Sequence, residues 1–531
     1  MKNIFSAALI NFTRMQLPAR VEWAAAAATA ILLILSFPDF EFSWLAWIAL
    51  VPLLWVVVRR PSPRTAFLLG WFAGTIFFYG SCYWLTYSMI HYGELPPVVA
   101  YLLLLPPTLL VGIFPGLFAL VLALVVRRFG VWAVLTAPLI WPALEWARLV
   151  ITGQLWNALG YSQAYHRMLI QPANWGGVYA VSFLIVTINA AIVLVLLKRN
   201  VWTLVAAPVI AAVVGFVILL APFIRNERWV SSDEVHSSVD VIALQPNVPM
   251  ALVKSTEEMN ALRERHLALS KQALANLPNA EYRRLVIWPE SPMNFTYASD
   301  QMFREWVAKF ATENHTALIF NSLEPAGPNA FYNSALLVNQ DGRMIAQYDK
   351  IRLMPFGEYV PLPQWLPGAS LITAIVGDFT PGDKYTLMPV GNYRAGVFIC
   401  IESAYPWIAR GLTNEGADVL INISNDGYLG PTAVMRQHLA NAVFRAVENG
   451  RPVLRVTNSG VSARIDEVGK IEDQTVAFQE DVRHWYFMRG PIESTFYSRH
   501  GDLFVQICAA LTVVILLTAL LKGRRSLRQQ R

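Results

Sequence analysis

The feature that most constrains the fold of this chain is a series of eight apolar runs, each near the length that crosses a lipid bilayer. A hydrocarbon core about 30 Å thick is spanned by a helix of about 20 apolar residues. The runs lie at residues 22–37, 42–58, 66–90, 98–126, 131–147, 178–197, 202–224 and 504–521. Only 15% of the residues are charged, against about a quarter in soluble domains. The sequence therefore predicts a polytopic α-helical membrane domain with eight transmembrane helices.

The Lys and Arg residues beside these runs predict how the chain is oriented. If the N-terminus is cytoplasmic, fifteen of them lie in cytoplasmic segments, and only Arg148 and Arg167 lie in the opposite short loops. Positive flanks favour the cytoplasmic side of a membrane. We therefore expect both termini in the cytoplasm and residues 225–503 on the far side. This topology also accounts for the net charge of +6, so no nucleic-acid partner is implied.

Residues 225–503 have the pattern of one water-exposed α/β domain. Short runs rich in Val, Ile and Leu alternate with amphipathic stretches, as in sheets covered by helices. Strands are expected at 239–244, 285–288, 317–321, 334–338, 344–347, 395–399, 419–423 and 453–457, and helices at 256–277, 301–313, 404–415 and 434–449. The chain then divides into a membrane domain with seven spans (1–224), an extracytoplasmic domain (225–503), and a last span with a basic tail (504–531).

Three of the expected strands end in residues suited to covalent chemistry. One apolar run stops at Glu290, a second is followed by Lys350, and a third runs into Cys400. Ligands of α/β domains bind at the carboxyl ends of strands, and a cysteine at a helix N-terminus tends to have a lowered pKa. Each residue alone has a structural explanation: a helix cap, a surface charge, a small buried side chain. Together they supply a base, an electrostatic stabiliser and a nucleophile for acyl transfer.

The segments around these residues resemble the nitrilase superfamily, whose members share a Glu-Lys-Cys triad and an αββα sandwich fold. The matching segments are Trp288-Pro-Glu290-Ser, Tyr348-Asp-Lys350, Pro355-Phe-Gly-Glu358-Tyr-Val-Pro361 and Cys400-Ile-Glu402. Eight spans around such a domain resemble the apolipoprotein N-acyltransferases. Pieces of the membrane half, such as Trp141-Pro-Ala-Leu-Glu145 and Gly160-Tyr-Ser-Gln163, match as well. The resemblance therefore covers nearly the whole chain, and it implies a nitrilase-like domain joined to the membrane helices.

The resemblance implies a reaction in two steps. An acyl chain passes from a phospholipid, with phosphatidylethanolamine as the expected donor, to a thioester on Cys400. It then passes to the α-amino group of the N-terminal diacylglyceryl-cysteine of an apolipoprotein. The implied catalytic residues are Glu290, Lys350 and Cys400, and the implied supporting or substrate-positioning residues are Glu358, Glu402, Ile401 and Asn425. The implied location is the bacterial inner membrane, with the catalytic domain in the periplasm. No cofactor is implied, and the scattered His residues suggest no metal site.

Some positions depart from the family pattern, and two other functions remain open. Ile401 replaces an aromatic residue, Tyr428 replaces a Trp, and residues 251–254 lack a Trp. The apolar segment 362–372 is interpreted as a lid that dips into lipid. A membrane-tethered amidase would keep the triad but use water as the acceptor. A transporter or receptor with a degenerate α/β domain would not need Cys400 at all.

Overall fold

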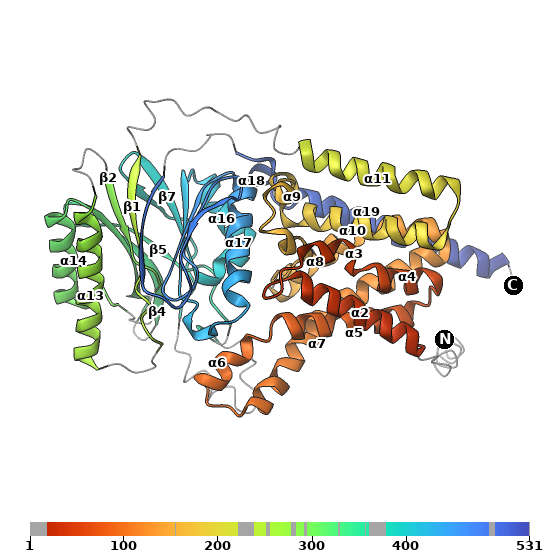
Figure 1. Ribbon diagram of the computed structural model, residues 1–531, viewed down its shortest axis with the longest axis horizontal. Helices are drawn as coiled ribbons and strands as arrows, with labels where there is room; N and C mark the ends of the chain where they lie inside the picture. The colour runs from red at the N-terminus through yellow and green to blue at the C-terminus, as the bar shows by residue number, and fades with distance from the viewer. Residues whose placement is uncertain are drawn as a thin grey trace.

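The computed structural model describes residues 18–153, 155–220, 238–250, 255–277, 283–290, 295–327, 330–355, 357–359, 379–487 and 494–529. The helices of the first 220 residues gather at one end of the molecule, two β-sheets with their own helices lie at the other, and the last helix, α19 (Leu503–Gln529), returns to the first end (Figure 1). The lid expected at 362–372 lies outside the described residues.

Each apolar run of the sequence contains helix. The helices are α2 (Arg20–Ser36), α3 (Ala46–Ala49), α4 (Val51–Arg59), α5 (Pro63–Ser81), α6 (Leu85–His91), α7 (Pro97–Phe129), α8 (Ala137–Thr152), α9 (Arg167–Ile170), α10 (Ala173–Leu197), α11 (Val201–Leu220) and α19 (Leu503–Gln529). In the described chain, five helices are long and apolar enough to cross a membrane, or six if α5 and α6, bent by 51°, form one span. The chain is thus a membrane protein, with fewer clear spans than the eight expected.

Two six-stranded sheets form the other half. In spatial order, the first sheet contains β12 (Asp481–Phe487), β1 (Val239–Gln245), β2 (Arg283–Ile287), β3 (Ala317–Pro325), β4 (Phe331–Val338) and β5 (Met344–Asp349). The second contains β11 (Ile471–Gln474), β10 (Ala463–Ile465), β9 (Val453–Thr457), β8 (Val419–Ser424), β7 (Tyr393–Ile399) and β6 (Leu387–Val390). All eight expected strands are present. The sequence did not predict β6, β10, β11 and β12.

Helices cover the outer faces of both sheets, which gives four layers. The helices α13 (Thr256–Ala275) and α14 (Gln301–Glu313) cover the first sheet, and α16 (Pro406–Asn414) and α17 (Val434–Asn449) cover the second (Figure 1). The alternation along β1 shows the layering, since Val241 joins the core between the sheets and Ile242 joins the core beneath α13 and α14. Neighbouring residues of a strand point to opposite faces. The fold is the αββα sandwich that the resemblance implied.

Helix α17 lies between the second sheet and the membrane helices. Fifteen of its sixteen residues are buried, because one side packs on β9 and the other contacts α10. The Oε1 atom of Gln437 accepts hydrogen bonds from the indoles of Trp84 and Trp156 at 3.0 and 2.8 Å. Its Nε2 donates to the carbonyls of Pro38 and Ser81. One buried amide therefore joins the two halves of the molecule.

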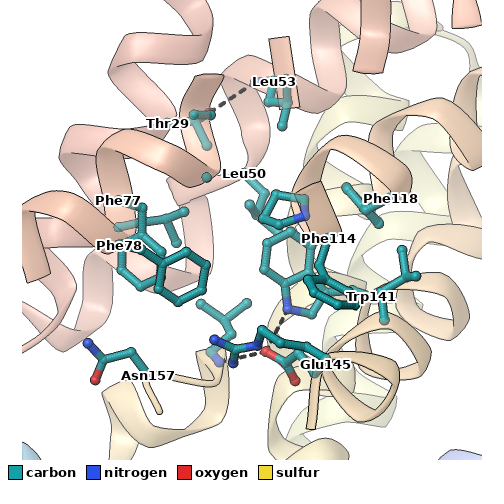
Figure 2. Close-up of a pocket in the computed structure, with 17 residues that line it drawn as sticks. Thr29, Leu50, Leu53, Phe77, Phe78, Phe114, Phe118, Trp141, Glu145 and Asn157 are labelled. Carbon is teal, nitrogen blue, oxygen red and sulfur yellow. Dashed lines mark hydrogen bonds between the residues drawn. The ribbon is translucent and has the colours of Figure 1, made fainter. Parts of the chain in front are cut away.

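A small cavity lies among α2, α4, α5, α7 and α8, lined mostly by apolar side chains (Figure 2). Its polar end is Glu145, which accepts hydrogen bonds from the Trp141 indole at 2.8 Å and from the backbone of Leu159 at 2.7 Å. Arg148 donates instead to the carbonyl of Trp156 at 2.9 Å. None of the expected catalytic residues lines this cavity, so it is not the reaction site.

Candidate active site

The three residues expected at strand ends come together between the two sheets. Glu290 lies just beyond β2 and Lys350 follows β5 directly, both on the first sheet, while Cys400 follows β7 on the second. The Nζ atom of Lys350 lies 3.4 Å from Oε1 of Glu290. The charges of both groups act on the Cys400 thiol. The pairing of strands far apart in the sequence thus builds one compact cluster.

Lys350 is buried between two carboxylates. Its side chain is only 1% exposed, and Nζ donates to Oε1 of Glu358 at 2.9 Å as well as approaching Glu290. Burial alone would lower the pKa of Lys350, but the two carboxylates raise it well above its ordinary value. The ammonium is therefore a fixed positive charge at neutral pH.

Asn333 is a member of the cluster that the sequence did not reveal. Its Nδ2 donates to Oε1 of Glu290 at 2.9 Å and to Oε1 of Glu358 at 2.6 Å. Its backbone carbonyl accepts from the N–H of Lys350 at 2.8 Å. The signal lies in the register of the hairpin: Ser334 pairs with Asp349, which places Asn333 opposite Lys350. One amide therefore holds both carboxylates on the lysine.

Cys400 is the junction between β7 and a short 3-10 turn, Cys400–Ala404. Its φ of +52° lies in the left-handed region, which costs a non-glycine residue about 1–2 kcal/mol. Burial raises the pKa of its thiol well above the ordinary value, and the charge of Glu290 raises it further against the opposing effect of Lys350. The lowered pKa expected at a helix N-terminus is wrong. Burial dominates, and the turn is too short to supply a helix dipole.

Glu402 ties the Cys400 turn to the lysine segment. Its carboxylate accepts the backbone N–H groups of Ile399 and Ile351 at 2.7 Å and of Arg352 at 3.0 Å. The hydroxyl of Tyr348 donates to it at 2.9 Å. Burial raises the pKa of Glu402 to about 7. It does not contact the Lys350 ammonium in any described hydrogen bond, so its position is that of a clamp between β5 and β7.

Glu358 and Asn425 complete the cluster. The Oε2 atom of Glu358 accepts the N–H of Met354 at 2.7 Å, which leaves Oε1 for Lys350. The backbone N–H of Asn425 donates to Oε2 of Glu290 at 3.1 Å. The side chain of Asn425 also orients its own loop, because its Oδ1 accepts the N–H of Gly427 at 3.2 Å. Ile401 is buried directly after Cys400.

Two family models match the chain, one on each half. Residues 29–191 match the apolipoprotein N-acyltransferase N-terminal domain, and residues 243–484 match carbon-nitrogen hydrolase. An apolipoprotein N-acyltransferase from Geobacter metallireducens is 34% identical over 98% of this chain and 100% of its own length. The chain belongs to the apolipoprotein N-acyltransferase family. An apolipoprotein N-acyltransferase from Pseudomonas syringae is 31% identical over 84% of this chain and 87% of its own length.

Among solved structures, a Saccharomyces cerevisiae member of the nitrilase superfamily matches 50% of this chain and 96% of its own. The identity is 18% and the TM-score 0.37. An amidase from Nesterenkonia matches with 14% identity and a TM-score of 0.34. Both cover about half of this chain.

Two of the departures from the pattern of the N-acyltransferase family fall within the described residues. Ile401 takes the place of an aromatic residue beside the thiol. Tyr428 lies in the turn after Asn425, where its carbonyl accepts the hydroxyl of Ser88 from α6 at 3.0 Å. Neither departure removes the carboxylate, the ammonium or the thiol of the cluster, so both alter the shape of the site and leave these three groups in place.

Proposed function

We propose that this chain transfers an acyl chain from a phospholipid, through a thioester on Cys400, to the α-amino group of the N-terminal diacylglyceryl-cysteine of apolipoproteins. The observation that carries the proposal is the buried cluster of a carboxylate, an ammonium and a thiol in a chain of this family. Phosphatidylethanolamine is the proposed donor. The amidase alternative is not favoured, because the relatives that match almost the whole chain are N-acyltransferases by name.

In the first half-reaction, Glu290 removes the proton from Cys400. A base is needed because the raised pKa keeps the thiol protonated at neutral pH. The sulfur attacks the ester carbonyl, and the negative charge that develops on oxygen is stabilised by Lys350 and by the N–H of Ile401. The C–O bond then breaks, and Glu290 returns its proton to the alkoxide of the lysophospholipid. The product is a thioester on Cys400.

In the second half-reaction, the acceptor amine attacks the thioester carbonyl. Glu290 accepts a proton from the amine, and the same two donors stabilise the oxyanion. The C–S bond breaks, the amide forms, and the proton passes from Glu290 to the Cys400 sulfur. The thiol and the carboxylate are then both restored.

The remaining residues of the cluster have supporting roles in this proposal. Glu358 holds Lys350 through the 2.9 Å contact and helps to position the incoming amine. Glu402 fixes the Cys400 turn against the segment after Lys350 through its backbone contacts. Asn425 holds Glu290 through its N–H.

Both proposed substrates carry acyl chains, which accounts for the join between a nitrilase-like domain and membrane helices. We place residues 225–503 on the periplasmic side of the inner membrane, both termini in the cytoplasm, and spans at all eight apolar runs. In this arrangement 1–224 holds seven spans and 504–531 the last span and basic tail. The Lys and Arg residues that flank the runs support this orientation.

The test is intact mass spectrometry of the detergent-purified protein after incubation with phosphatidylethanolamine, with Cys400→Ala beside it. We expect a gain of one acyl chain that hydroxylamine removes and that the variant lacks. A diacylglyceryl-cysteine peptide should then discharge the adduct and become acylated on its amine. Release of free fatty acid with no acylated peptide would identify water as the acceptor. No adduct on folded protein would refute the thioester.

A further inference from the structure

The peptide bond between Cys400 and Ile401 carries the N–H proposed as an oxyanion donor and a carbonyl that accepts hydrogen bonds from side chains. Its N–H belongs to Ile401, the proposed oxyanion donor, and its C=O belongs to Cys400. In a trans peptide these two groups point in opposite directions within one plane. The carbonyl of Cys400 accepts hydrogen bonds from Nε2 of His438 at 3.0 Å and from Nδ2 of Asn422 at 3.4 Å. Whatever holds this carbonyl therefore also sets the direction of the Ile401 N–H.

The hydrogen-bond partners of His438 determine where its protons lie. A carbonyl oxygen only accepts, so Nε2 must carry a hydrogen. The other ring nitrogen, Nδ1, lies 2.8 Å from Oδ1 of Asp426, and one proton must lie between these two atoms for the contact to be favourable. The pair is neutral overall whichever atom holds that proton, and in both cases Nε2 donates to Cys400.

A buried guanidinium fixes the partners of this pair. Arg455 is fully buried and donates to Oδ2 of Asp426 at 2.6 Å and to Oδ1 of Asn422. Burial alone would raise the pKa of Asp426, but the charges of Arg455 and His438 hold it below its ordinary value. Burial and the charge of Arg455 lower the pKa of His438 against the opposing effect of Asp426. With its oxygen on Arg455, Asn422 must turn its NH₂ group toward the Cys400 carbonyl. One hydrogen-bond network thus directs both Nε2 of His438 and Nδ2 of Asn422 at the Cys400 carbonyl.

The backbone of Cys400 needs such support. Its left-handed φ of +52° is a conformation that persists only where the surrounding structure enforces it. His438 lies in α17, directly after Gln437. The side-chain amide of Gln437 joins the membrane helices to the sandwich domain. The indole of Trp156 donates to Gln437, and its ring centroid lies 5.7 Å from that of His438. The support is therefore anchored on both the sheet and the membrane helices.

We propose that His438, held by Asp426 and aided by Asn422, is a positioning residue that aims the Ile401 N–H at the oxyanion. This inference rests on the proposed function in one respect, the assignment of that N–H as an oxyanion donor. It assigns His438 no contact with substrate and no proton transfer. It predicts that His438 matters for attack on a carbonyl and not for the reactivity of the thiol itself.

The test compares two reactions of Cys400 in the full-length protein. Acylation by a p-nitrophenyl ester passes through an oxyanion, whereas alkylation by iodoacetamide does not. A glutamine amide nitrogen can occupy the place of imidazole Nε2, and an asparagine amide nitrogen only that of Nδ1. His438→Gln, His438→Asn and His438→Leu therefore separate the contact with Cys400 from the contact with Asp426. Asn441→Ala, which changes a buried polar residue of the same helix, is the matched control.

We expect His438→Asn and His438→Leu to slow acylation roughly 10- to 100-fold, less than the 100- to 1000-fold loss from deleting a donor. Their alkylation rates should stay near that of the wild type, and His438→Gln should recover most of the acylation rate. The control should leave both rates unchanged. Equal losses in acylation and alkylation would assign His438 a general structural role and overturn the proposal. So would an unchanged acylation rate in His438→Asn.

The design keeps this inference separate from the proposed function. Phospholipid is a second acyl donor in the same assay, and only that reaction depends on the physiological substrate. Wild-type protein that reacts with the p-nitrophenyl ester but not with phospholipid would refute the proposed function, while the variants would still decide the role of His438. Wild-type protein that reacts with iodoacetamide but with neither ester would refute both.

Discussion

Replacement of Asn333 is the perturbation whose effect the structure defines most closely. The amide nitrogen has two hydrogens, and both are used, one on Glu290 and one on Glu358. Its oxygen accepts the side chain of Asn321 at 2.7 Å. Asn333→Leu keeps the approximate volume and removes both contacts to the carboxylates. Among the described residues, Glu290 then keeps the N–H of Asn425 and the 3.4 Å contact with Lys350.

The magnitude follows from the number and kind of bonds lost. A hydrogen bond to a charged group contributes about 1.5–3 kcal/mol. If the bond to Glu290 is lost in the transition state, the acylation rate should fall roughly 10- to 150-fold. The bond to Glu358 acts through Lys350 and adds to the loss of folding stability. Asn333→Asp should be worse than Asn333→Leu, because it places a third carboxyl group against two carboxylates.

The assay is single-turnover acylation of Cys400 by phosphatidylethanolamine, read by intact mass, with the thermal unfolding midpoint measured on the same samples. Asn321→Leu is the matched comparison, since it removes two hydrogen bonds from the same sheet but none to a carboxylate. It should lower the unfolding midpoint with a much smaller effect on rate. Equal rates in Asn333→Leu and the wild type would refute the reasoning.

Three further outcomes are expected. Gln437→Leu leaves two indole N–H groups unpaired and should destabilise the protein by about 2–6 kcal/mol; an unchanged unfolding midpoint would contradict this. The pKa of Cys400 is raised above its ordinary 9.0, so the rate of its alkylation by iodoacetamide should still be rising at pH 9.0. Glu290→Gln removes a negative charge and should shift this pH profile to lower pH. A wild-type rate that reaches its plateau below pH 9.0 would contradict the prediction. The raised pKa of Glu402, about 7 against an ordinary 4.5, means that the folded state keeps a proton that the unfolded state releases between these values. Stability should therefore fall as the pH rises from 4.5 to 7, and Glu402→Gln should remove this dependence in thermal unfolding.

The sequence predicted which reactive groups would meet, because Glu290, Lys350 and Cys400 each follow an apolar strand. The topology of an α/β domain brings such strand ends together. The eight principal strands were predicted because they are short apolar runs rich in Val, Ile and Leu. The late strands β10 to β12 are short or more polar, and β12 is held in place by its pairing with β1, a contact over more than two hundred residues that local patterning does not contain.

The supporting groups could not be predicted, since their meaning depends on register and on packing. Asn333 is an ordinary polar residue near the start of an apolar strand until the hairpin register places it opposite Lys350. The pKa of Cys400 was expected to be lowered because the sequence shows a strand followed by a helix. The structure separates the thiol from α16 by a 3-10 turn and buries it, and desolvation then outweighs the dipole.

Helix α17 shows why the two halves of this protein must be considered together. A helix on the outside of a soluble αββα sandwich would keep a polar face toward water. Here that face meets the membrane helices, so its polar residues must find partners there. Arg436 pairs with Glu41 at 2.7 Å, and Gln437 binds five groups of the membrane half. The next residue, His438, donates to the Cys400 carbonyl. Three consecutive residues thus connect the membrane helices to the proposed nucleophile. A displacement of these helices relative to the sheet would have to break buried hydrogen bonds or carry the Cys400 peptide with it.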